Sequence, residues 1–219
     1  METNRRLLKA WVAATLGIVA LELLVSGPGS RLGLPPLLRT GMARAAEACW
    51  ILTSLFLAGL GRREIFLPEA GLARGLRRGL LWSAGFGALA LAACAVLWGQ
   101  GRDPLRWLGL GGGAFASEPV LYLAVACGVG PVVEELYFRG LLYRLLRMRG
   151  RVLAVGGTTL VFGLLHAGAG GLPWVPLVGG ALFAVALEIE KNLLVPITIH
   201  VLGNTALFAL AHFAPKFQL

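Results

Sequence analysis

Seven apolar segments alternate with short polar loops along this chain of 219 residues. A helix needs about 20 apolar residues to cross a bilayer, and a lone strand cannot satisfy its backbone hydrogen bonds there. The pattern therefore predicts an all-α protein, a polytopic transmembrane helix bundle of about seven spans, within a range of about six to eight. The segments are residues 8 to 26, 41 to 60, 79 to 98, 118 to 146, 152 to 167, 174 to 190 and 193 to 213.

Composition supports a membrane location. Hydrophobic residues make up 57% of the chain and charged residues only 14%, and the mean hydropathy is +0.76. These values are far from those of an ordinary soluble domain. We expect one transmembrane domain over residues 1–219, surrounded by the lipid bilayer, without a separate soluble catalytic domain.

The net charge of +9 raises the question of a nucleic-acid partner. The arginines, however, form clusters between apolar segments and not one basic face with interleaved aromatic residues. We interpret them as topology signals, expect no nucleic-acid partner, and predict an integral protein of the plasma or inner membrane with a cytoplasmic N-terminus. In that orientation the inner loops hold Arg5, Arg6, Lys9, Arg62, Arg63, Arg74, Arg77, Arg78, Arg144, Arg147, Arg149, Arg151 and Lys191.

Three charged residues lie inside the fourth apolar segment, in the run PVVEELYFRGLLY: Glu134, Glu135 and Arg139. A charge at membrane depth costs on the order of a few kcal/mol, so such residues pair, line a cavity or carry out chemistry. Glu135 and Arg139 have the spacing and order of a helical ion pair. Glu134 projects about 100° away and is left without a local cation. The alternative interpretation is a structural charge cluster that fixes helix packing.

Other acidic residues have a simpler explanation. Glu22 and Glu47 lie near the outer ends of their predicted helices, and Glu188 and Glu190 lie near the inner end of the sixth. Solvation is available at these depths, so we interpret all four as interface residues.

Two later segments add polar side chains that share helix faces. Phe162 and His166 are four residues apart in VFGLLHAG, and His200 and Asn204 are four apart in PITIHVLGNTALF. Singly, such residues are more often packing or interhelical hydrogen-bonding residues. At a rise of roughly 1.5 Å per residue, however, Glu134, His166 and Asn204 all lie roughly 20 Å from the basic inner border, with His200 one turn lower. We therefore predict that the four side chains meet.

Such a set suits hydrolysis of an amide by an activated water. Glu134 would take the proton, His166 would hold or polarise the water, and His200 with Asn204 would donate hydrogen bonds to the oxyanion. Serine or cysteine nucleophiles do not neighbour these groups in sequence, and the HExxH zinc signature does not occur. We expect no cofactor, although two imidazoles and a carboxylate are also a plausible zinc set.

The same residues resemble the motifs of a known family. EELYFR is similar to the EExxxR motif, FGLLH to FxxxH and HVLGN to HxxxN of the CPBP intramembrane endopeptidases. That family includes the Ras-converting CAAX protease and bacterial members formerly grouped as Abi proteins. The resemblance covers about residues 118–213, the expected catalytic core, and it implies a glutamate-dependent intramembrane protease with Glu134, His166, His200 and Asn204 as catalytic residues. Glu135, Arg139 and Phe162 would then have supporting roles.

The sequence leaves the substrate open. The resemblance implies a membrane-associated protein or peptide, and an outward-leaning site would suit a carboxyl-terminal sorting tail, as in enzymes of the myxosortase type. Two other functions stay open: a proton-coupled transporter using Glu134 and the histidines, and a peptide-binding or immunity protein that does not cleave.

Overall fold

The predicted helices all form. The structure is a computed structural model that describes residues 2–67, 71–104, 108, 118–167 and 172–213. Each apolar segment is a helix in these ranges, and a short 3-10 turn, η1 (Pro28–Leu32), follows the first one. The helices are α1 (Glu2–Ser26), α2 (Pro36–Leu57), α3 (Leu72–Gly99), the composite helix Pro119–Arg147, α8 (Arg151–Leu165), α9 (Trp174–Glu190) and α10 (Leu194–Phe213).

Four of these helices are long and apolar enough to cross a membrane: α1, α3, Pro119–Arg147 and α10. The apolar helix α8 is shorter. The helical membrane bundle predicted from the sequence is therefore confirmed, and the protein is an integral membrane protein. Whether α2, α8 and α9 also cross the bilayer completely stays a prediction.

The apolar pattern predicted an uninterrupted α-helix for Pro119–Arg147, and the structure differs from that prediction. Two seven-residue π-helical stretches interrupt the helix, one on each side of the short segment that carries Glu134 and Glu135. Because π turns are rare and occur often at functional sites, their position draws attention to this segment. In order, the parts are α5 (Pro119–Tyr122), η3 (Leu123–Val129), α6 (Gly130–Glu135), η4 (Leu136–Leu142) and α7 (Tyr143–Arg147).

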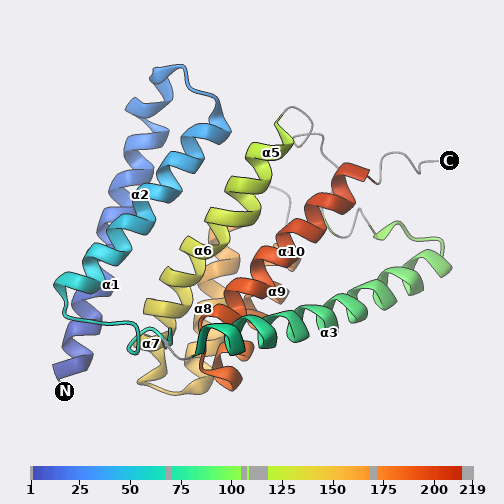
Figure 1. Ribbon diagram of the computed structural model, residues 1–219. Coiled ribbons are helices and arrows are strands. Elements are labelled where there is room, and N and C mark those ends of the chain that lie inside the picture. The colour runs from blue at the N-terminus through green and yellow to red at the C-terminus, as the bar shows by residue number, and fades with distance from the viewer. Residues whose placement is uncertain (1, 68–70, 105–107, 109–117, 168–171, 214–219) are drawn as a thin grey trace.

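The composite helix occupies the middle of the bundle. Figure 1 shows the α1–α2 hairpin on one side of it and α8, α9 and α10 on the other. Side chains from both sides pack on it and form the main core, which includes Ala14, Ile51, Leu141, Ala154 and Leu187. The segment with Glu134 and Glu135 is thus held from both sides.

Helix α3 is attached at one end. The amide nitrogen of Asn192 donates a hydrogen bond of 2.9 Å to the carbonyl of Gly71. Gly75 and Gly79 allow α3 to approach closely, because a Cβ at Gly79 would lie 2.5 Å from Cβ of Thr198 on α10. The rest of α3 projects away from the bundle (Figure 1), and none of its most apolar window is buried by protein. Lipid would cover this surface.

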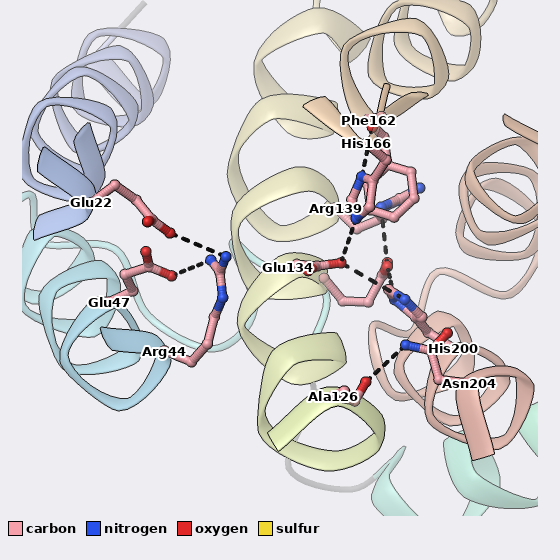
Figure 2. A network of polar contacts seen from close by, with 11 residues as sticks. Glu22, Arg44, Glu47, Ala126, Glu134, Arg139, Phe162, His166, His200 and Asn204 are labelled. Carbon is pink, nitrogen blue, oxygen red and sulfur yellow. Dashed lines mark hydrogen bonds and ion pairs between the residues drawn. The ribbon is translucent and has the colours of Figure 1, made fainter. Parts of the chain in front are cut away.

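One acidic residue of the α1–α2 hairpin does not fit the sequence-based interpretation. Glu47 is completely buried and bonds to Arg44 at 2.6 Å, while Arg44 also pairs with Glu22 at 3.1 Å (Figure 2). The prediction that Glu47 is an interface residue was therefore wrong, because α2 packs that face against protein. Glu22 keeps a side chain that is 45% exposed.

Glu188 and Glu190 do have the surroundings expected near an interface. Glu190 pairs with the half-exposed Arg78 at 2.6 Å. Glu188 joins basic residues from three neighbouring segments, namely Arg147, Arg151 and Lys191. These contacts lie at the end of the bundle that holds the basic loops.

Candidate active site

Two imidazoles face the carboxylate of Glu134. Oε2 of Glu134 lies 3.8 Å from Nε2 of His166 and 3.7 Å from Nε2 of His200. Glu134 is on α6, His166 caps the carboxyl end of α8 and His200 is in α10. Figure 2 shows the three side chains pointing toward one another from these elements. The structure thus brings together three of the four residues to which the sequence assigned catalysis.

The three differ in exposure. The side chain of His200 is 6% exposed, that of Glu134 is 20% exposed and that of His166 is 36% exposed. The group therefore extends from the protein interior toward the surface of the bundle. A substrate or a water molecule can approach Glu134 from the side of His166.

Hydrogen bonds fix the orientation of both rings. Nδ1 of His166 lies 2.8 Å from the carbonyl oxygen of Phe162, and Nδ1 of His200 lies 2.9 Å from Oε1 of Glu135. Both oxygens accept hydrogen bonds, so each Nδ1 carries a proton. In its neutral form each ring then has a lone pair on Nε2, directed toward Glu134. A water molecule between them would find three acceptors for its two hydrogens.

Glu135 is the partner of both Arg139 and His200. Nη1 of Arg139 donates to Oε1 of Glu135 at 3.0 Å, and both side chains are 0% exposed. The ion pair predicted from the four-residue spacing is therefore formed. Nη2 of Arg139 donates to the carbonyl of Gly180 on α9, also at 3.0 Å. Arg139 thereby joins α9 to the helix that carries both carboxylates.

Three aromatic rings surround the Arg139 guanidinium. Its Cζ lies 5.6 Å from the ring centre of Phe138, 4.9 Å from that of Phe162 and 5.2 Å from that of Phe183. A cation over ring faces is stabilised without water. Phe162 also contacts His166, with ring centres 4.3 Å apart. The supporting position expected for Phe162 is thus beside both the arginine and the histidine.

Asn204 has a different neighbour. Its Nδ2 donates a hydrogen bond of 2.9 Å to the backbone carbonyl of Ala126 in η3, as Figure 2 shows. An amide nitrogen has two hydrogens, so one stays available for a second acceptor. His200, which the depth argument had placed one turn lower, lies closer to Glu134 than that argument implied, because its long side chain reaches both carboxylates.

Sequence reasoning missed two residues that shape the site. Phe183 stacks on His200 with ring centres 4.5 Å apart. Gly180 gives its carbonyl to Arg139, and a Cβ there would lie 3.3 Å from the ring of Phe162. Both lie on α9, which carries neither a histidine nor a motif of the resemblance. The apolar pattern of α9 offered no signal for them.

A metal site receives little support from the donor arrangement. Across the described ranges, no group of three or more His, Cys, Asp or Glu side chains is placed to hold a metal ion.

Comparison with known proteins identifies the region that contains the site. Curated proteins and solved structures gave no significant match. A family model described as "Type II CAAX prenyl endopeptidase Rce1-like" matches residues 116–206. This range includes all seven residues to which the sequence assigned catalytic or supporting roles. Residues 116–206 are therefore similar to the type II CAAX prenyl endopeptidase Rce1-like family.

Proposed function

We propose that this protein is a glutamate-dependent intramembrane endopeptidase that cleaves a membrane-associated protein tail or precursor. The observation that carries the proposal is the convergence of Nε2 of His166 and Nε2 of His200 on the Glu134 carboxylate, at 3.8 and 3.7 Å. A carboxylate beside oriented imidazoles is the arrangement of a general base with a bound water. The family match supports the same class of reaction.

In the proposed reaction, Glu134 takes a proton from water while the water oxygen attacks the carbonyl carbon of the scissile peptide bond. His166 accepts a hydrogen bond from that water and orients it. The carbonyl oxygen becomes an oxyanion, which needs donors placed in advance. When the intermediate collapses, the C–N bond breaks and Glu134 passes its proton to the departing amine nitrogen.

His200 is the proposed main donor to the oxyanion. Its Nδ1 is engaged with Glu135, so Nε2 can donate only if the ring carries a second proton. The second Nδ2 hydrogen of Asn204 is the other proposed donor.

The first test is Glu134→Gln in purified protein, assayed on membrane-anchored tail peptides with and without a prenyl group. Gln keeps the size of the side chain but cannot accept a proton, so kcat should fall by about 10²–10⁴-fold. Glu118→Gln is the matched control, because Glu118 caps the start of the same helix. It should keep wild-type kcat.

Three outcomes would count against the proposal. Full activity in Glu134→Gln would remove Glu134 as the base. Loss of activity with a chelator and recovery with added zinc would replace the glutamate mechanism with a metal centre. If wild type cleaves none of the tails but still binds them, a peptide-binding function would take the place of the protease.

A further inference from the structure

The backbone carbonyl of Ala126 accepts a side-chain hydrogen bond in the middle of a helix. In the α or π register, its backbone partner would be the N–H of residue 130 or of residue 131. The N–H of Gly130 bonds instead to the carbonyl of Val125, five residues back. Residue 131 is proline and has no N–H. The carbonyl of Ala126 is thus released by Pro131, and Asn204 occupies it at 2.9 Å.

An unpaired carbonyl at membrane depth is costly because lipid offers no donor. Pro131 is itself fully buried. Asn204 supplies the donor from another helix. The proline therefore creates an attachment point on the Glu134 helix, the Ala126 carbonyl eight residues before Glu134, to which α10 can bond.

This attachment belongs to a row of contacts along one face of α10. His200, Asn204 and Phe208 are each four residues apart and so share that face. They meet the composite helix at Glu135, Ala126 and Tyr122 in that order: His200 through its 2.9 Å bond, Asn204 through Ala126, and Phe208 by stacking on Tyr122 with ring centres 5.1 Å apart. The middle contact fixes how far α10 is shifted along its neighbour.

We propose that Asn204 is a positioning residue that acts through the Ala126 carbonyl released by Pro131, and that this bond holds His200 level with Glu134 and Glu135. The role uses one Nδ2 hydrogen and is separate from the oxyanion contact proposed above. It deepens the proposed function, because the group that it positions is the proposed oxyanion donor. It also makes Pro131 a functional residue, although proline has no reactive group.

The test is a double-mutant cycle of Asn204→Ala and Pro131→Ala. For each variant, the melting temperature is measured in detergent, and kcat and KM are measured on a cleaved tail peptide. Asn204→Ala should lower the melting temperature and lower kcat at least tenfold with KM changed less than threefold. Pro131→Ala restores an N–H to residue 131, which can bond to the Ala126 carbonyl. In the Asn204→Ala background it should therefore recover most of the lost melting temperature and part of the lost kcat.

Pro196→Ala is the matched control in the same background. Pro196 is also fully buried, but it lies in the first turn of α10, where the N–H of an introduced alanine could not reach the Ala126 carbonyl. It should give no recovery. Additive effects of Asn204→Ala and Pro131→Ala on both readouts would overturn the proposal and leave Asn204 with the oxyanion role alone. Because the melting temperature needs no substrate, the cycle stays decisive even if no peptide is cleaved and the protease proposal fails.

Discussion

At the scale of single residues, Glu135 contacts more of the site than the supporting role expected from the sequence implied. One of its oxygens, Oε1, accepts from both Arg139 and His200. Helical spacing alone predicts the first contact. The second joins residues 65 positions apart, and a single sequence contains no information that pairs them. The motif residues could thus be named in advance, but not which carboxylate each imidazole would contact.

Arg139→Lys should destabilise the protein strongly. A lysine among the three rings cannot donate hydrogen bonds to both Glu135 and Gly180. The buried Glu135 carboxylate therefore loses part of the charge and hydrogen bonding that stabilise it. Breaking a buried ion pair costs about 3–5 kcal/mol, and we expect a large drop in melting temperature in detergent. Arg78→Lys is the control, since the Arg78 side chain is 47% exposed and such pairs contribute about 0–1 kcal/mol. Equal effects of the two changes would contradict this view of Arg139.

At the scale of elements, apolar length predicted the helices well because every backbone group in lipid must be satisfied within its own helix. Their bounds differ from the predicted segments mostly at the ends, as for α3, which begins at Leu72 and not at 79. The π stretches could not be predicted, because the apolar pattern of this helix does not distinguish α turns from π turns. The close approach of α3 to α10 was hidden because the sequence does not say that Gly79 faces Thr198.

Gly79→Ala should weaken the attachment of α3. The new Cβ would lie 2.5 Å from Cβ of Thr198, so α3 and α10 must separate, at a cost of about 1–3 kcal/mol. Gly85→Ala on the same helix is the control, because a Cβ there meets nothing within 4 Å. It should be neutral or slightly stabilising. Thermal unfolding of both variants in one detergent measures the difference. A melting temperature of Gly79→Ala equal to that of the wild type would argue against this packing.

At the scale of the whole molecule, the basic loops predict a direction in the membrane. Arg147, Arg151 and Lys191 gather at one end of the bundle around Glu188, as expected if their loops lie on one side. The region that matches the family model contains the candidate site and most of the core, while α1, α2 and α3 lie before it in the chain. The orientation itself stays a prediction.

Reporter fusions test that orientation. With a cytoplasmic N-terminus and seven crossings, a reporter active only outside should be inactive when fused before residue 2 and active when fused after Phe213. A reporter active only inside should give the reverse pattern. Activity of the same reporter at both positions would indicate an even number of crossings.

The π stretches also set a limit on how this protein can change. In Leu136–Leu142 each turn holds more residues than an α-helix needs, so removing one residue there would let the helix tighten to a regular α form. The helix on either side would keep nearly its present direction, because a π turn is an α turn with one residue added, but a removal between Glu135 and Arg139 would shorten their four-residue spacing to three. The number of residues in this stretch is therefore part of the site, and a chimera that joins this helix to that of another protein must keep the number of residues between Glu135 and Tyr143.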